Sequence, residues 1–270
     1  MNEIRDATKE KEMAADLLAL GLYLSLVILL LLGAIIGRRV GSWQIRHDPD
    51  HKLNVVSVAE GGVFALLGLL IALTFTGAYE RFEAQKVHVI DEANAIDTAY
   101  SRFSLLAPAN RGDLRNLFTQ YVDAEVAIFS DVLNANETTQ KINYAKTLQT
   151  KIMNAVVIAC NAQHDGYVTQ LIIPAVNNMF ESANTRLELS KIHPPVAIYA
   201  FLVGLTVLSA FLAGFSTAKK SGHSAIHILC YILITALTLY LIMDLEFPRV
   251  GLIRVDGFDK VLMDTKDHFD

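Results

Sequence analysis

Stretches without any charge alternate along this chain with stretches in which apolar residues recur at every third or fourth position. Residues 61–79 carry no charge, and a helix needs about 20 apolar residues to cross a bilayer. Residues 80–106 follow without proline or glycine. Their main apolar residues share one helical face: Val89, Ala93, Ile96, Tyr100 and Phe103. The pattern predicts one continuous helix over 61–106, about 70 Å long, which leaves the membrane and continues into a soluble bundle.

Three other apolar runs predict further transmembrane helices. The first ends where Arg38 and Arg39 introduce charge, and we expect a loop of about 20 residues after it, with Trp43 at the membrane interface. The chain then divides into four parts: a first transmembrane pair in 1–79, with spans about 17–37 and 60–79; a helical extramembrane domain in 80–191; a second transmembrane pair in 192–244, with spans about 195–217 and 225–243; and a C-terminal tail in 245–270. The predicted fold class is an all-α integral membrane protein with four transmembrane helices and one helical extramembrane domain, whose first helix continues the second span.

The extramembrane domain is predicted to contain three more amphipathic helices, over about residues 113–133, 141–162 and 167–189. We call the apolar face from Val89 to Phe103 the seam. We expect it to be buried against apolar residues of those helices: Leu117, Tyr121, Ile172 and Met179.

Composition supports the membrane assignment and excludes other classes. Hydrophobic residues make up 53% of the chain and the mean hydropathy is +0.36, which is unusual for a soluble domain of this length. The net charge of −5 provides no basic patch, so no nucleic-acid partner is expected. Cys160 and Cys230 lie far apart in sequence and are predicted to form neither a disulfide nor a metal motif.

One loop holds residues that resemble metal ligands. His47, Asp48, Asp50 and His51 lie within RHDPDHK, and imidazole and carboxylate both bind divalent cations. The proline interrupts helical spacing and no other His or Cys is near, so a solvated loop is the favoured interpretation and no metal is expected. His227, near the start of the fourth span, is interpreted as an interface residue rather than a proton relay.

No enzyme is predicted. Asp91, Glu92 and Asp97 could serve as catalytic carboxylates, but charges on an amphipathic helix usually form its solvated face, and no nucleophile accompanies them. The chain contains no nucleophile elbow, phosphate-binding loop, zinc-protease motif or dinucleotide fingerprint. No cofactor is expected.

The second span carries a row of mostly small residues on one side. We call it the small stripe: Gly61, Ala65, Gly68, Ala72, Thr76 and Tyr79. Two interpretations stay open from the pattern alone. Small residues allow helices to approach closely inside a membrane. Alternatively, the stripe faces a central pore formed by several copies of the chain.

Four segments resemble the bestrophin-like domain family of bacterial membrane proteins. GLLIALTFTGAYERFEAQK and DEANAIDTAYSRFSLL belong to the long helix, IIPAVNNMFESANTRL precedes the third span, and DLEFPRVGLIRV follows the fourth. They occur in the family's order and cover about residues 55–256. The more distant bestrophins are pentameric ion channels with four spans per subunit and a pore lined by the second span. The resemblance therefore implies a homo-oligomeric channel, with a pentamer as the expected assembly.

The resemblance also implies roles for individual residues. YERFE, from Tyr79 to Glu83, resembles the end of the bestrophin second span, and Gly68 resembles its glycine. The bulky residues of the bestrophin neck match Gly61, Ala65 and Leu69, of which two are small, implying a wider neck or a gate elsewhere. The acidic calcium clasp of bestrophins has no counterpart here. The expected pore-lining residues are therefore the small stripe and Leu69.

Glu83 is the expected selectivity residue. It continues the small stripe beyond the membrane, so a ring of subunits would place a ring of carboxylates at the pore mouth, which favours cations. The alternative is a local ion pair with Lys86, three residues further along the helix.

The function expected from these observations is passive ion conduction with a weak preference for cations. The alternative is a non-conducting membrane scaffold or stress sensor whose helical domain binds a partner. The expected partners are membrane lipid, further copies of the chain and inorganic ions. The expected location is the inner cell membrane, as a multi-pass protein. Arg and Lys residues near the spans occur on both sides, so the positive-inside rule does not assign a side to the helical domain.

Overall fold

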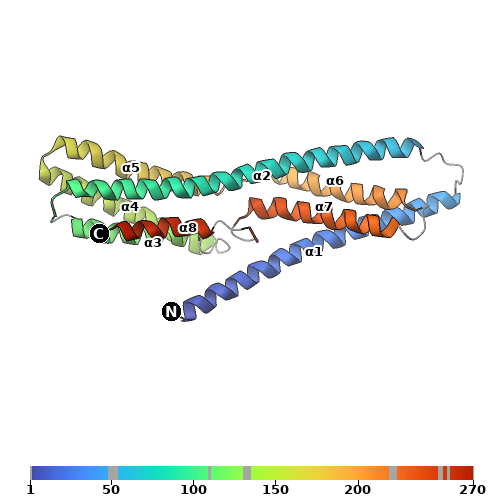
Figure 1. The fold of residues 1–270 in the computed structure, drawn as a ribbon, viewed down its shortest axis with the longest axis horizontal. Coiled ribbons are helices and arrows are strands. Elements are labelled where there is room, and N and C mark those ends of the chain that lie inside the picture. The colour runs from blue at the N-terminus through green and yellow to red at the C-terminus, as the bar shows by residue number, and fades with distance from the viewer. Residues whose placement is uncertain are drawn as a thin grey trace. The chain divides into compact units, whose positions relative to one another are not determined.

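The computed structural model describes residues 2–47, 54–108, 111–129, 135–218, 224–248, 252–253 and 256–269. These residues form helices and no strand, which confirms the predicted all-α fold. The elements are α1 (Asn2–His47), α2 (Asn54–Arg102), η1 (Phe103–Leu105), α3 (Arg111–Ile128), α4 (Ala135–Gln163), α5 (Gly166–Leu189), α6 (Val196–Ser216), α7 (Ser224–Glu246), α8 (Asp256–Asp264) and η3 (Thr265–His268), where η marks short 3-10 helices (Figure 1).

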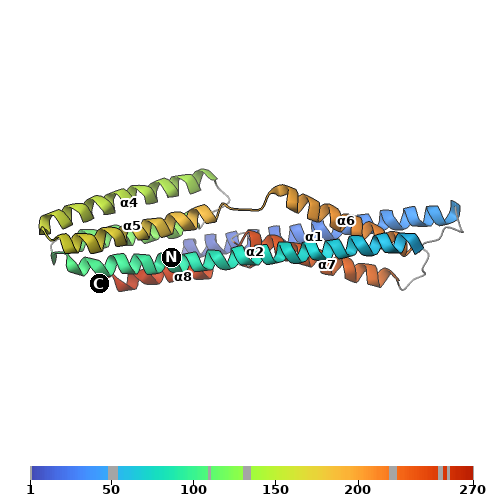
Figure 2. The same ribbon diagram turned by 90° about the horizontal axis from the view of Figure 1, so that it is seen from above.

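The chain divides into two compact units. Unit 1 comprises residues 1–82 and 193–253, and unit 2 comprises residues 83–192 and 254–270. Helix α2 contributes to both and is one unbroken element, as Figures 1 and 2 show. The predicted continuous helix is therefore confirmed. It begins at Asn54 rather than Gly61, and it ends at Arg102, where η1 leads toward Pro108.

Within the part of the chain that the structure describes, four helices are long and apolar enough to cross a membrane: α1 from Leu17, α2 from Val58, α6, and α7 from Ala225. The protein is therefore an integral membrane protein. Helix α2 has 49 residues, which is far more than a bilayer of about 30 Å requires. We therefore treat its charge-free part, residues 61–79, as the span.

Helix α1 differs from the prediction at its C-terminal end. It continues past Arg38 and Arg39 to His47, so the expected loop of about 20 residues is wrong, and Trp43 lies on the helix with 61% of its surface exposed. Charge ends an apolar span without ending a helix, because arginine is a good helix former. The sequence offers no proline before Pro49, which lies outside the described residues.

In unit 1, α1 packs on α6 and α7. The contact with α6 uses glycines at four-residue spacing on α1: Gly33, Gly37 and Gly41. A Cβ at Gly37 would collide with the carbonyl oxygen of Phe211, and one at Gly214 on α6 would collide with that of Ala34. The backbones of α1 and α6 therefore touch directly, which is how small residues stabilise helix pairs in lipid.

The predicted core of unit 2 is confirmed in its main features. Val89, Ala93, Ile96 and Phe103 are buried and Tyr100 is half-buried. Tyr121, Ile172 and Met179 are also buried on their respective helices. On α3, however, Leu117 is only half-buried, and the neighbouring Phe118 packs its ring 4.8 Å from that of Phe103.

Residues 245–270, which were predicted to form a C-terminal tail, contribute to both units. Residues 252–253 belong to unit 1, and α8 and η3 belong to unit 2. Leu262, Thr265 and Phe269 are buried there. The Phe269 ring stacks on Tyr100 of α2, with centroids 4.2 Å apart. The last helix thus completes the apolar core that the seam begins.

Candidate functional site

The small stripe of α2 stays exposed in the single chain. All six residues are exposed, including Tyr79 at 48%, and the adjacent Leu69 is exposed at 57%. A Cβ built on Gly61 or Gly68 meets no atom within 4 Å. The face of α2 that packs within unit 1 is a different one, marked by Leu67 and Ala78. The stripe therefore does not serve helix packing within the described chain.

Glu83 lies at the start of unit 2 and contacts Lys86. The Lys86 ammonium pairs with Glu83 Oε1, so the local pair that the sequence allowed is present. The Glu83 side chain nevertheless keeps 39% of its surface exposed. A partly exposed pair of this kind contributes at most a few tenths of a kcal/mol. The carboxylate is therefore held only weakly by its own helix.

An ion pair joins three segments of unit 1 around the buried carboxylate of Glu246, whose side chain is 1% exposed. Arg81 Nε donates to its two oxygens at 3.1 and 2.9 Å, and Arg81 Nη2 donates to Oε2 at 2.6 Å. His193 Nδ1 lies 3.1 Å from Oε1. This forked arrangement is the strong form of a charge-assisted hydrogen bond. It fixes the end of α7 to α2 and to the segment before α6.

Unit 2 contains a buried cluster of one guanidinium and three carboxylates, which we call the Arg186 cluster. Arg186 Nε lies 2.7 Å from Glu92 Oε2, and the two side chains are 4% and 0% exposed. Arg186 Nη2 lies 3.9 Å from Glu125 Oε2 and donates to the Glu125 carbonyl oxygen at 3.2 Å. Arg186 Nη1 lies 3.8 Å from Asp259 Oδ1. The guanidinium also stacks over the Phe129 ring, with its carbon 4.2 Å from the centroid.

The burial of this cluster changes its acid–base chemistry. Burial raises the pKa of Glu125, while the Arg186 charge and a hydrogen bond from Tyr121 act in the opposite direction. Burial also raises the pKa of Tyr121, assisted by the neighbouring Glu125 and Glu92 charges. The cluster therefore favours the protonated form of at least one of its acids.

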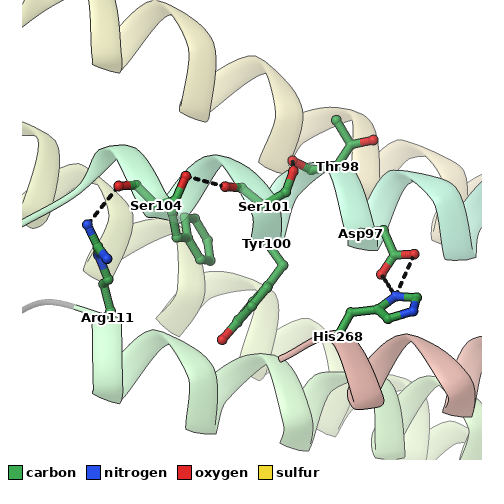
Figure 3. Close-up of a pocket in the computed structure, with 8 residues that line it drawn as sticks. Asp97, Thr98, Tyr100, Ser101, Ser104, Arg111 and His268 are labelled. Atoms are coloured by element: carbon green, nitrogen blue, oxygen red, sulfur yellow. Dashed lines mark hydrogen bonds and ion pairs between the residues drawn. The ribbon is translucent and has the colours of Figure 1, made fainter. Parts of the chain in front are cut away.

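An open cavity of about 490 Å³ lies at the C-terminal end of α2 (Figure 3). It is lined by Asp97, Thr98, Tyr100, Ser101, Phe103, Ser104, Arg111 and His268. The hydroxyls of Thr98, Ser101 and Ser104 each donate to a backbone carbonyl of α2, at 2.7, 3.1 and 2.8 Å. These protons go to carbonyl oxygens rather than to a side-chain base, which is the partner that a nucleophilic hydroxyl needs. Arg111 likewise donates to the carbonyl oxygens of Ser104 and Leu106.

The comparisons with known proteins identify the family. A model of the bestrophin-like domain matches residues 24–257. The chain belongs to the bestrophin-like family. Comparison with curated proteins finds no match.

Solved structures show that this bestrophin-like chain shares a known fold. One is the crystal structure of a bacterial bestrophin homologue from Klebsiella pneumoniae, with a TM-score of 0.66 and 14% identity, covering 92% of this chain and 98% of that one. A second structure of that homologue, carrying one substitution, has the same TM-score and identity and covers 90% and 99%.

The four bestrophin-like motifs meet in pairs. Arg81, from the first motif, binds Glu246, from the fourth. Glu92, from the second, pairs with Arg186, from the third. Each unit thus contains an ion pair that joins two motifs distant in sequence.

The structure also places the histidines and cysteines that the sequence of this bestrophin-like chain singled out. His47 lies on α1 with Nδ1 3.0 Å from the Trp43 carbonyl oxygen, whereas Asp48, Asp50 and His51 lie outside the described residues. His227 is exposed on α7. Cys160 is buried and Cys230 is exposed, and both are free thiols.

The acidic residues of α2 require one correction. Asp91 is exposed, and Asp97 lies 3.2 Å from His268 Nδ1 at the surface. Glu92, in contrast, is fully buried, so its assignment to a solvated face is wrong. A signal was available: Val89, Glu92 and Ile96 follow the same three-and-four spacing, which places Glu92 within the seam.

Proposed function

We propose that this protein is a homo-oligomeric ion channel, assembled as a pentamer in the inner cell membrane, whose central pore is lined by the small stripe and Leu69. The observation that carries the proposal is the exposed, charge-free stripe on a transmembrane helix of a bestrophin-like fold. The next exposed face of α2 carries the bulky Leu66 and Leu73, at 47% and 63% exposure, which suit contact with lipid or a neighbouring subunit.

Burial within the chain supports a role for α2 in assembly. In the most apolar 18-residue stretch of α2, 6% is buried within the chain. The corresponding stretches of the other three spans are 28–33% buried. A helix that packs so little on its own chain leaves surface available to further copies. Association through small residues gives close contact in lipid.

Conduction is tested by reconstituting the purified full chain in planar bilayers. A channel gives step-like currents. Absence of current from protein shown to be oligomeric and correctly folded in the same preparation would favour the scaffold or sensor function instead.

Assembly around α2 gives the first prediction. Ala65→Cys, in a chain lacking Cys160 and Cys230, should yield covalent dimers with a bismaleimide crosslinker, because Ala65 would repeat around the central axis. The matched control is Leu66→Cys, one residue further and turned by about 100°, which should crosslink less. A strictly monomeric protein in mild detergent, or equal crosslinking at both positions, would contradict the proposed pore.

Selectivity gives the second prediction. If Glu83 lines the pore mouth, Glu83→Gln should move the reversal potential across a salt gradient toward zero, because it removes one carboxylate per subunit. Lys86→Gln should have the opposite effect, since it removes the cation that pairs with Glu83.

The control for this prediction is Glu80→Gln, an exposed glutamate three residues earlier, which is turned by about 60° from Glu83 and lies further from the line of the small stripe. It should move the reversal potential less than Glu83→Gln does. An anion-selective parent, or equal effects of Glu80→Gln and Glu83→Gln, would remove Glu83 from the pore and leave conduction itself unaffected.

A further inference from the structure

The Arg186 cluster has more acid than base. Three carboxylates, from Glu92, Glu125 and Asp259, surround one guanidinium within 3.9 Å. If all three were ionised, the cluster would carry a net charge of −2 in a region shielded from water. Like charges at this separation and burial disfavour full ionisation, so the folded cluster retains a proton that its acids would release in water.

The groups around the cluster come from five helices of unit 2. Helix α2 contributes Glu92, α3 contributes Glu125 and the Tyr121 hydroxyl, α5 contributes Arg186, and α8 contributes Asp259. Helix α4 contributes the neutral amide of Gln149, which lies 3.4 Å from the Tyr121 oxygen. Arg186 is thus the cation that lies among the three acids.

We propose that the Arg186 cluster is a pH-sensitive attachment for the C-terminal helix α8, which is held on unit 2 while the cluster keeps its extra proton and is released as that proton is lost. The attachment involves residues of unit 2 alone and is independent of ion conduction.

Helix α8 is the element that is released, because its carboxylate, Asp259, is the least buried of the three. The Asp259 side chain is 14% exposed, against 0% for Glu92 and 5% for Glu125. Helix α8 has nine residues, and its release exposes the buried side chains of Leu262 and Phe269 while the longer helices α3, α4 and α5 stay packed. Moving Asp259 into water removes one negative charge from the cluster. The remaining acids would then face Arg186 with a smaller excess of charge.

The sign of the effect follows from proton linkage. The attached state binds more protons than the released state. The free energy that favours the attached state is therefore largest at acid pH and decreases as the pH rises. For a one-proton difference, the equilibrium constant for release grows about tenfold per pH unit.

Two other ion pairs join the same segment to unit 2. Lys266 Nζ lies 2.6 Å from Asp123 Oδ1 on α3. His268 Nδ1 lies 3.2 Å from Asp97 on α2, and this pair is ionic only when the imidazole is protonated. Both pairs have substantially exposed side chains. They serve as controls for the proposed sensor.

The experiment is amide hydrogen exchange of the full chain in detergent from about pH 6 to about pH 9, corrected at each pH for the exchange rate of an unstructured peptide. Protection of residues 256–269 should fall by about tenfold per pH unit over part of this range, while α3, α4 and α5 stay protected. Glu125→Gln should reduce this slope to less than about threefold per pH unit. Asp259→Asn, on α8 itself, should do the same if Glu125→Gln fails to fold.

The controls separate the cluster from the surface pairs. Asp123→Asn should lower the protection of α8 equally at every pH and leave the slope unchanged. His268→Gln should also retain the slope. A pH-independent parent, an unchanged slope in both cluster variants, or loss of the slope in His268→Gln would overturn the proposal.

Discussion

Arg186→Leu is expected to unfold unit 2 or to prevent its stable expression. The substitution leaves Glu92, Glu125 and Asp259 facing one another without the Arg186 guanidinium, and Glu92 and Glu125 are almost fully buried. Removing one partner of a buried ion pair typically costs about 3–5 kcal/mol, a large part of the stability of a domain, which is about 5–15 kcal/mol. The measurement is thermal unfolding of the purified protein, or its yield as a single species in gel filtration.

Two further variants identify the cause of this loss. Arg115→Leu, at an exposed position of α3, should change stability by less than about 0.5 kcal/mol. The double variant Arg186→Leu with Glu92→Leu should recover part of the loss, because apolar side chains can replace a buried pair at little cost. If Arg186→Leu is as stable as the parent, the cluster does not hold the bundle together.

Gly37→Ala is expected to prevent α1 from packing on α6. A Cβ at Gly37 would collide with the backbone carbonyl oxygen of Phe211, and a backbone atom cannot rotate away as a side chain can. Overpacking usually costs about 1–3 kcal/mol, and we expect at least the upper end of this range here. Gly214→Ala meets the carbonyl oxygen of Ala34 and should have the same effect.

The matched control for this pair is Gly204→Ala, on the same helix α6, where a Cβ meets no atom within 4 Å. It should keep or slightly raise stability, since alanine favours helix over glycine by about 1 kcal/mol. Thermal stability in detergent compares the three variants. Equal stability of Gly37→Ala and Gly204→Ala would show that α1 and α6 can separate without loss of the fold.

The elements of this fold were predictable because their signals are local. An uncharged run of sufficient length predicts each span, and the three-and-four spacing from Val89 to Phe103 predicts the seam. The prediction that Leu117 is the buried residue, where the structure buries Phe118 instead, shows the limit of such spacing patterns. Adjacent residues differ by about 100° on a helix, and an apolar residue at both positions leaves the buried one undetermined.

The sites were harder to predict because their partners are distant in sequence. The spacing of Val89, Glu92 and Ile96 places Glu92 within the seam, but its partner Arg186 lies more than 90 residues further along the chain. The glycines of α1, at positions 33, 37 and 41, have the spacing of a close helix contact. This interpretation was open for the small stripe of α2, but the close contact lies on α1 instead.

The ion pair between Arg81 and Glu246 has a consequence for the rotation of α2 about its own axis. Apolar packing along the span can resist such rotation only weakly, because so little of the span is buried. The Arg81 fork, with two nitrogens on one fixed carboxylate, resists it strongly. The side of α2 that turns outward is therefore decided by a polar contact at one end of the span more than by the packing along it.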